Sequence, residues 1–239
     1  MELKQKAAIV TGGSKGIGRA IALALAKEGV RVGIAARTPE AVEETAAQIR
    51  ACGVEAFPFV GNMAVEADIQ AFVTGAAKAF GKLDILVNNA GIGKFHTIGE
   101  FPTSDWDDMF NLNVRGLFIA TRESLPHLRK AGESIVVNVA SIAGKNHFKH
   151  GGGYAATKHA VLGFSRCLML EERDNGVRVL AICPGSVRTD FFDAHTDVSQ
   201  ERLDSMLHVD DVAESVIHMM RLPQRAMVSE IDIRPTNPK

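Results

Sequence analysis

The chain contains little of what stabilises a disulfide scaffold or marks a membrane protein. Its three cysteines, Cys52, Cys167 and Cys183, are too far apart for the spacing of a zinc site or a redox pair. This sparse, odd number is typical of a reducing compartment, so we expect a cytoplasmic location. No stretch approaches the roughly 18 consecutive apolar residues of a membrane span, and the N-terminal MELKQKAAIVTGG has no apolar signal-peptide core.

Excess charge of either sign is also missing. The 27 Lys and Arg residues are balanced by 28 Asp and Glu residues, which gives a formal net charge of −1. Because the sequence has no cluster of basic residues, we expect neither nucleic acid nor a membrane surface as a partner. The hydrophobic fraction of 46% is high enough to form a core on both faces of a sheet.

Apolar, β-branched runs alternate with helical patterns along the whole chain. We expect strands at residues 6–12, 30–36, 54–60, 83–91, 133–141, 176–185 and 229–235. Helices are expected at residues 16–29, 39–53, 64–81, 103–130, 154–175 and 209–221. Continuously apolar strands separated by helices predict a parallel sheet covered on both faces. The sequence therefore predicts an α/β, doubly wound Rossmann fold in a single domain spanning residues 1–239.

A glycine-rich turn, TGGSKGIG at residues 11–18, follows the first expected strand and opens the first helix. Gly12, Gly16 and Gly18 let the backbone approach a ligand closely, and the helix N-terminus offers N–H groups to a diphosphate. A dinucleotide site is therefore expected here. The alternative is a tight turn whose glycines serve only packing, because glycine triplets are weak signals.

The end of the second strand indicates which dinucleotide binds. Many NAD-binding folds carry an acidic residue there for the ribose 2′-hydroxyl, whereas an arginine suits a 2′-phosphate. This chain has Ala36 and Arg37 at that place, and Lys15 lies in the glycine turn. Two cations without a carboxylate favour NADP(H). Alternatively, Arg37 is a solvated loop charge.

Tyrosine is nearly absent, since Tyr154 is the only one beside twelve phenylalanines. Lys158 follows one helical turn later and would share its helix face. A lysine cation there is expected to lower the tyrosine pKa from about 10 toward neutrality, so that the phenol can exchange a proton with a carbonyl oxygen. The alternative is a packed tyrosine with a lysine snorkelling beside it.

Ser141 ends the fifth expected strand, thirteen residues before Tyr154. A serine at that edge can donate a hydrogen bond to a substrate carbonyl and hold it for hydride transfer. The alternative role for Ser141 is a helix cap or a turn residue.

Taken together, these residues match a known family. The chain resembles the short-chain dehydrogenases/reductases over essentially its whole length, and most resembles members of the 3-oxoacyl-(acyl-carrier-protein) reductase type. Six motifs carry the resemblance, in the family's order: TGGSKGIG (11–18), NNAG (88–91), NLNVRG around Asn113, Ser141, YAATK (154–158) and PGSVRT (184–189).

The resemblance implies a role for each matching residue. Tyr154 would be the catalytic acid/base, Lys158 would tune it and hold the nicotinamide ribose, Ser141 would orient the carbonyl, and Asn113 would support a water that links Lys158 to solvent. The cofactor-binding residues it implies are Gly12, Ser14, Lys15, Gly16, Ile17, Gly18, Arg37, Thr38, Asn62, Asn89, Ala90, Gly91, Tyr154, Lys158, Pro184, Gly185, Val187 and Thr189.

Three features depart from the family pattern. Asn62 stands where an aspartate is common beside the adenine, although an amide can still hydrogen-bond there. Residues 186–208 would form the substrate lid, and the part from 190 to 208 is short for one. The C-terminal SEIDIRPTNPK lacks the glycine pair that often closes the last strand.

The substrate is expected to be a small carbonyl compound or the matching alcohol. A 3-oxoacyl thioester, another small ketone, a 3-hydroxy acid, a sugar and a cyclic ketone all stay open, because substrate choice depends on the lid. In the loop 144–153, the side chains of Lys145, His147, Lys149 and His150 either contact an anionic substrate group or form a solvated loop. We expect no metal there, since no carboxylate cluster accompanies the histidines.

Two other functional classes stay open at this stage. One is an NADP(H)-binding regulatory protein without catalysis, but Ser141, Tyr154, Lys158 and Asn113 are all present. The other is an epimerase or dehydratase with the same Tyr–Lys pair, which usually has a longer chain. From the resemblance we expect a homodimer or homotetramer, formed through the long helix near Asn113 and the helix of Tyr154.

Overall fold

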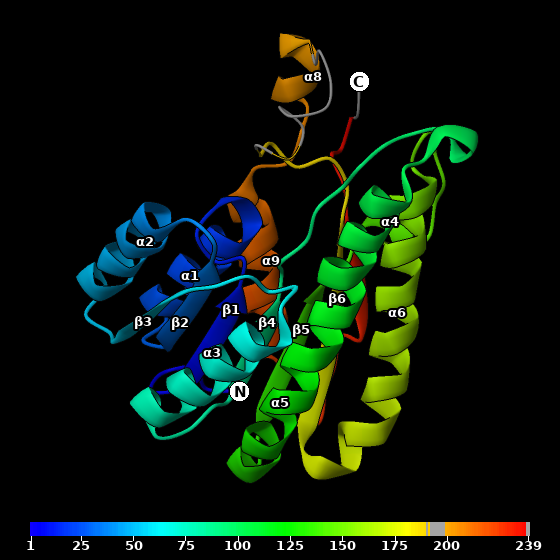
Figure 1. Cartoon of the computed structure of the whole chain (residues 1–239). Coiled ribbons are helices and arrows are strands. Elements are labelled where there is room, and N and C mark those ends of the chain that lie inside the picture. The colour runs from blue at the N-terminus through cyan, green and yellow to red at the C-terminus, as the bar shows by residue number, and fades with distance from the viewer. Residues whose placement is uncertain (190, 192–198, 238–239) are drawn as a thin grey trace.

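The computed structural model describes residues 1–189, 191 and 199–237, and in this part of the chain seven strands form one parallel sheet (Figure 1). The order across the sheet is β3-β2-β1-β4-β5-β6-β7. The strands are β1 (Ala7–Thr11), β2 (Arg31–Ala36), β3 (Ala56–Val60), β4 (Ile85–Asn88), β5 (Ser134–Val139), β6 (Val177–Pro184) and β7 (Glu230–Ile233). The predicted doubly wound parallel sheet is confirmed.

Helices cover both faces of this sheet. One face carries α1 (Gly16–Lys27), α2 (Pro39–Ala51) and α9 (Val209–Arg221), and the other carries α3 (Glu66–Phe80), α5 (Leu117–Ala131) and α6 (Gly152–Glu172). The shorter elements are α4 (Thr103–Phe110), α8 (Gln200–Asp204), the π-helix η2 (Asn111–Gly116), and the 3₁₀ turns η1 (Ile98–Glu100), η3 (Ile142–Gly144) and η4 (Arg173–Asn175). None of the helices described here is long and apolar enough to cross a membrane.

Side-chain alternation in the strands builds the two cores. In β1, Ala8 and Val10 pack with α1, α2 and α9, whereas Ala7 and Ile9 pack with α3 and α5. Strands β1, β4, β5 and β6 are buried along their whole length, which explains why they lack the polar alternation of a half-exposed strand. Strand β3 is only partly buried and tolerates Pro58, because a proline without an N–H fits an edge strand.

The strand order reverses next to β1, since β2 and β3 lie on one side of it and β4 to β7 on the other. In an open parallel sheet, ligands bind outside the carboxyl ends of the strands at such a reversal. The loops that carry the predicted site residues follow β1, β2, β4, β5 and β6. The fold therefore brings them to one edge of the sheet.

The expected helix over residues 103–130 is interrupted in the structure. It consists of α4, the π-helix η2 and α5, so one helical pattern contains a wider turn at Asn113. The side chain of Asn113 bonds Ile92 across the loop, and Gly116 lies so close to Met63 that an added Cβ would be 2.2 Å from its carbonyl oxygen. Periodicity alone misses this interruption, because a π-turn inserts only a local change of register.

The predicted lid over residues 186–208 is described at residues 186–189, 191 and 199–208, since residues 190 and 192–198 lie outside the described part of the chain. The two ends of the lid pair with each other. Val187 forms an isolated parallel bridge with Leu207, and the Leu207 N–H donates to the Ser186 carbonyl at 3.0 Å. The beginning and the end of this segment therefore lie side by side.

A matched pair of valines tests the predicted energetics of the core. Val136 in β5 is fully buried, whereas Val60 at the end of β3 is 51% exposed. Val136→Ala should lower the free energy of unfolding by about 2–3 kcal/mol, because methyl groups leave a packed core and a cavity remains. Val60→Ala should change it by less than about 0.5 kcal/mol. Urea denaturation of both variants makes the measurement, and equal effects would contradict this assignment of core and edge.

Candidate active site

The glycine turn after β1 has the backbone that the sequence predicts for a ligand cradle. Gly12 and Gly16 adopt left-handed backbone angles, with φ of 64° and 50°. A Cβ on Gly18 would lie 2.3 Å from Asn89 Nδ2, so α1 can approach the turn only with glycine there. A Cβ on Gly16 would lie 3.3 Å from Thr189 Cγ2, which places the turn beside the segment that follows β6. Among the described residues, no side chain caps the N-terminus of α1.

The same turn is tied to the loop after β4. Asn89 Nδ2 donates to the carbonyl oxygens of Thr11 and Gly12, each at 3.0 Å. Thr11 Oγ1 in turn accepts from the N–H groups of Asn89 at 3.0 Å and Ala90 at 3.1 Å. The NNAG motif therefore braces the cradle. The sequence did not single out Thr11 as a site residue, although it lies within the quoted glycine motif.

The residues predicted for the far end of the cofactor lie after β2 and β3. Arg37 and Thr38 are exposed directly beyond β2, and Lys15 is exposed in the glycine turn. Asn62 uses its side-chain oxygen to accept from the Ala64 N–H at 3.0 Å. Its own N–H donates to the Asp68 carboxylate at 2.8 Å, which brings an acid to this corner from α3.

Other predicted cofactor residues lie around the two sides of this cradle. Ser14 is buried, and its carbonyl accepts from Thr45 Oγ1 at 3.4 Å, a contact from α2 that the sequence did not reveal. Beyond β6, the Gly185 N–H donates to the Ile233 carbonyl at 2.8 Å, and Val187 is buried. The remaining members of the set lie at the same edge: Ile17 and Gly91 beside the turns, and Pro184 at the end of β6.

Ser141, Tyr154 and Lys158 come together beyond β5. Ser141 Oγ accepts from the Ala143 N–H at 3.1 Å and donates to the Pro184 carbonyl at 3.5 Å. Lys158 is buried in α6, donates from Nζ to the Val139 carbonyl at 2.9 Å, and lies 5.7 Å from the centroid of the Tyr154 ring. The structure shows Ser141 as the cap of a turn, and its role toward a substrate carbonyl stays a prediction.

Burial determines the proton affinities of this group. Desolvation raises the pKa of Tyr154 to about 12, although a hydrogen bond with the Ser141 side chain acts to lower it. Desolvation also lowers the pKa of Lys158 to about 8. The expectation that Lys158 brings the tyrosine pKa toward neutrality is wrong for this arrangement, because loss of water around both groups disfavours both charged forms.

Asn113 holds the loop after β4 against α6. Its Nδ2 donates to the Ile92 carbonyl at 2.8 Å and to Thr157 Oγ1 at 3.1 Å, while its Oδ1 accepts from the Ile92 N–H at 2.9 Å. A Cβ on Gly91 would lie 3.2 Å from the same Oδ1. Asn113 is therefore a clamp between η2, this loop and α6. Thr157 completes the clamp and was not singled out from the sequence.

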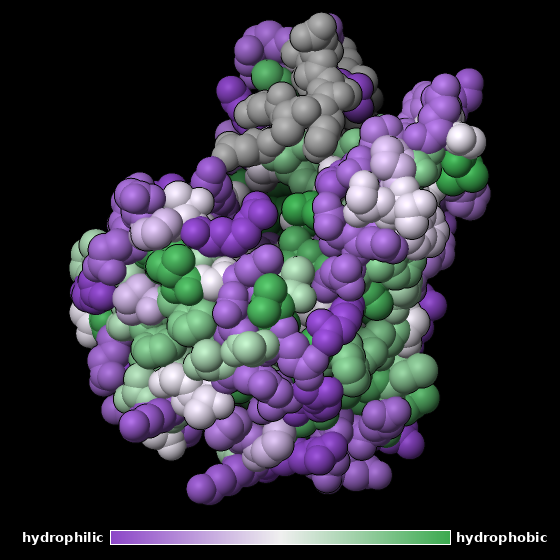
Figure 2. Space-filling view, in the orientation of Figure 1, coloured by the Kyte–Doolittle hydropathy of each residue, from purple (hydrophilic) through white to green (hydrophobic). Residues whose placement is uncertain are grey.

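Phenylalanine rings lie around Tyr154, and no sequence pattern assigned them to the site. Phe95 and Phe191 lie with ring centroids 5.8 Å and 5.5 Å from Tyr154, and Phe148 lies 5.9 Å from Phe95. These phenylalanines come from the three segments that follow β4, β5 and β6. Their only signal in the sequence is that each follows a strand. Figure 2 shows hydrophobic surface in the hollow between α4 and the α1 side of the molecule.

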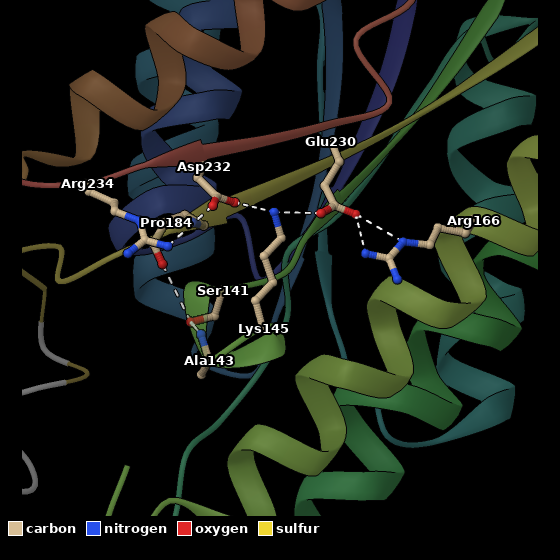
Figure 3. A network of polar contacts seen from close by, with 8 residues as sticks. All are labelled: Ser141, Ala143, Lys145, Arg166, Pro184, Glu230, Asp232 and Arg234. Atoms are coloured by element: carbon tan, nitrogen blue, oxygen red, sulfur yellow. Dashed lines mark hydrogen bonds and ion pairs between the residues drawn. The ribbon is translucent and has the colours of Figure 1, made fainter. Parts of the chain in front are cut away.

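The four basic residues of the loop 144–153 do not share one environment. His147, Lys149 and His150 are exposed, which agrees with a solvated loop. Lys145 instead lies between two carboxylates of β7, 2.6 Å from Glu230 Oε1 and 2.5 Å from Asp232 Oδ1 (Figure 3). The sequence of this loop could not reveal Glu230 and Asp232 as partners of Lys145, because they lie more than 80 residues away along the chain.

Comparison with known proteins identifies relatives along nearly the whole chain. The model of the family described as short chain dehydrogenase matches residues 6–200. A 3-oxoacyl-[acyl-carrier-protein] reductase FabG of Staphylococcus aureus is 34% identical over 199 residues, covering 83% of this chain and 81% of the relative. An uncharacterized oxidoreductase of Staphylococcus aureus is 32% identical over 233 residues, covering 98% of each.

Two solved structures resemble this chain closely. An alcohol dehydrogenase from the archaeon Thermococcus sibiricus, complexed with 5-hydroxy-NADP, has a TM-score of 0.90 and 30% identity, with 98% of this chain and 99% of the other covered. A metagenomic short-chain oxidoreductase in complex with NADP has a TM-score of 0.86 and 32% identity, with 99% and 100% covered.

The lowered pKa of Lys158 predicts a pH-dependent stability. Between about pH 8 and its unfolded value of 10.5, the unfolded chain holds a proton that the folded chain has released. From about pH 8 to about pH 9, stability should therefore rise by about 1.4 kcal/mol per pH unit. Above about pH 9 the raised pKa of the Cys183 thiol, about 11 in the folded chain against 9.0, opposes this rise. The raised pKa of Tyr154 acts only above pH 10, where it lowers stability.

Urea denaturation from about pH 8 to about pH 9, below the range in which Cys183 contributes, measures this dependence. Lys158→Met should abolish the rise, whereas Lys149→Met, which changes an exposed lysine, should leave the slope as it is. Parallel curves for the wild type and Lys158→Met would contradict the assignment.

Proposed function

The chain belongs to the short chain dehydrogenase family, and on that premise we propose that it is an NADP(H)-dependent oxidoreductase acting on a carbonyl group or the corresponding secondary alcohol. One observation carries the proposal. Ser141 and Tyr154 lie close to each other at the carboxyl edge of the sheet, and Lys158 Nζ lies 5.7 Å from the centroid of the Tyr154 ring. Such a pair of hydroxyl groups can bind and protonate one carbonyl oxygen.

The residues at the cradle fit a nicotinamide dinucleotide. The left-handed glycines and the start of α1, which no described side chain caps, suit a diphosphate, and Arg37 and Lys15 suit a 2′-phosphate. Thr189 beside Gly16 would line the path toward the nicotinamide. NADP in the metagenomic oxidoreductase and 5-hydroxy-NADP in the archaeal enzyme support this choice. When bound, the cofactor supplies or accepts the hydride.

The chain's own groups handle the proton. At neutral pH Tyr154 holds its proton firmly, since its pKa is raised to about 12, and it donates that proton to the carbonyl oxygen during reduction. Ser141 Oγ binds the same oxygen and directs it at the phenol. Lys158, whose pKa is lowered to about 8, lies close enough for its cation to stabilise the tyrosinate left behind. Asn113 keeps the loop after β4 in place.

The surroundings of Tyr154 favour a carbonyl compound with an apolar substituent. Phe95, Phe148 and Phe191 present hydrocarbon to this side of the tyrosine. The cation of Lys94, next to Phe95 in the chain, is already paired, since its Nζ lies 2.7 Å from both Asp105 and Asp108. An anionic group on the substrate would find this charge neutralised. Aliphatic, aromatic or cyclic ketones are therefore the first candidates.

A second candidate substrate is a 3-oxoacyl thioester. It is favoured by the Staphylococcus aureus relative named as a 3-oxoacyl-[acyl-carrier-protein] reductase, at 34% identity. The acyl chain of such a thioester would also suit the phenylalanines. The carrier part would have to bind the exposed loop with His147 and Lys149.

The proposal extends to the organisation of the chain. Residues 1–239 would form one dinucleotide-binding and catalytic domain, in which residues 186–208 cover the substrate. The cysteines Cys52, Cys167 and Cys183 are free, which supports a cytoplasmic location. Exposed apolar residues on α5 and α6, Phe118 and Leu170, support a homodimer or homotetramer.

Turnover of a carbonyl panel tests the proposed function. NADPH oxidation is followed by absorbance with aromatic, cyclic and aliphatic ketones and with an acetoacetyl thioester. We expect the aromatic, cyclic and aliphatic ketones to give a higher kcat/KM than the acetoacetyl thioester. Tyr154→Phe should lower kcat about 10²- to 10⁴-fold, because it removes the general acid, while the Kd for NADPH changes little. Activity of Tyr154→Phe within threefold of the wild type would refute the assigned acid.

Cofactor choice is tested at Arg37. Arg37→Gln should raise the KM for NADPH by roughly 10-fold or more and leave the KM for NADH unchanged, because a charge-assisted hydrogen bond to the 2′-phosphate is lost. Arg50→Gln is the matched control, since Arg50 is an exposed arginine on the adjoining helix α2. Equal use of NADH by the wild type would show that Arg37 does not select the cofactor.

A further inference from the structure

Lys145 forms the centre of a charge network between the site and the last strand. Its ammonium bonds Glu230 and Asp232, and these carboxylates also pair with Arg166 at 3.0 Å and Arg234 at 3.3 Å (Figure 3). The side chains of Lys145, Glu230 and Asp232 are only 29%, 21% and 31% exposed. Their attraction is therefore screened less than that of a fully solvated pair.

The network is connected to Ser141 in two directions. Along the chain, Lys145 directly follows the turn η3, which Ser141 caps, and the Lys145 N–H donates to the Ile142 carbonyl at 3.0 Å. Across the sheet, Asp232 pairs in register with Cys183, and the next residue, Pro184, accepts the hydrogen bond from Ser141 Oγ. Lys145 thus closes a ring of contacts that begins and ends at Ser141.

Packing limits the movement of this turn on its other side. A Cβ on Gly144 would lie 2.8 Å from Leu162 Cδ1 and 2.8 Å from the Lys158 carbonyl oxygen. The turn therefore already touches α6 and cannot move closer to it. Movement away from α6 is opposed by the bonds from Lys145 to β7.

A metal ion is the competing explanation for this cluster. Ligand atoms of Cys183, Glu230 and Asp232 all lie within 4.8 Å of one another. However, the Lys145 ammonium bonds both carboxylates, and burial raises the pKa of the Cys183 thiol to about 11, so the thiolate is disfavoured. The cluster is an ion-pair network centred on lysine.

We propose that Lys145 is a positioning residue, which holds the turn η3 between α6 and β7 so that Ser141 stays directed at the substrate oxygen beside Tyr154. The assignment rests on the proposed carbonyl reduction. It gives the carboxylates of β7, at the opposite end of the sequence from the cofactor turn, a part in catalysis through Ser141.

The experiment measures kcat and KM with the best ketone of the panel and NADPH. Lys145→Met should lower kcat about 10- to 100-fold, because a misplaced serine no longer binds the carbonyl oxygen, while the KM for NADPH stays within twofold. Lys145→Arg, which can still bond both carboxylates, should restore most of the rate. Arg166→Met is the matched control, since it removes an ion pair with Glu230 that does not reach the turn.

A double-mutant cycle separates positioning from a general structural effect. In a Ser141→Ala background, Lys145→Met should cost less than twofold in kcat, because the group that it positions is already gone. The same loss in both backgrounds, or an equal loss in Arg166→Met, would overturn the assignment. Should Lys145→Met fail to fold, Asp232→Asn and Glu230→Gln each remove one partner and take its place in the cycle.

The outcomes for the two proposals are distinguishable. A wild type that turns over no carbonyl while it binds NADPH would overturn the proposed reaction, and with it the role of Lys145. An active wild type with additive effects in the cycle would overturn the role of Lys145 alone. Non-additivity together with rescue by Lys145→Arg would establish it.

Discussion

Burial of the sheet on both faces is the constraint on which the rest of the structure depends. The central strands consist almost entirely of buried side chains, so polar groups are solvated or paired mainly where strands end. Because every strand runs in the same direction, the loops with polar groups meet at one edge. Two polar side chains inside the sheet bond each other, since Asn88 Nδ2 donates to Asn138 Oδ1 at 2.9 Å. The candidate active site therefore lies at the carboxyl edge of the sheet, where polar side chains can be solvated or paired.

The same lack of water determines the chemistry of Tyr154 and Lys158. Burial raises the proton affinity of the phenol and lowers that of the amine, so the charged form of each group is less favoured than it is in water. A charge that develops on one group then interacts strongly with the other, because the protein between them has a lower dielectric constant than water. The pair is thus suited to a proton that leaves the tyrosine only when a substrate oxygen accepts it.

Contacts distant in the sequence complete the site. The rings of Phe95, Phe148 and Phe191 gather from three loops, and Lys145 finds its carboxylates on β7. The C-terminal tail lacks the glycine pair common in the family, and it provides Glu230 and Asp232 to the turn beside Ser141. No local pattern reveals such pairs, because side chains 87 residues apart meet only after the sheet has formed.

Features that depend on residues close together in the chain could be predicted from the amino-acid sequence alone. Alternation of apolar runs with helical periods gave the parallel sheet, and the glycines after the first strand gave the left-handed turn. The spacing of Tyr154 and Lys158 placed them on one helix face. Only the tertiary structure decided the direction of the tyrosine pKa, the π-turn at Asn113 and the partners of Lys145. Each of these depends on how much water and which distant group the packed chain leaves beside a side chain.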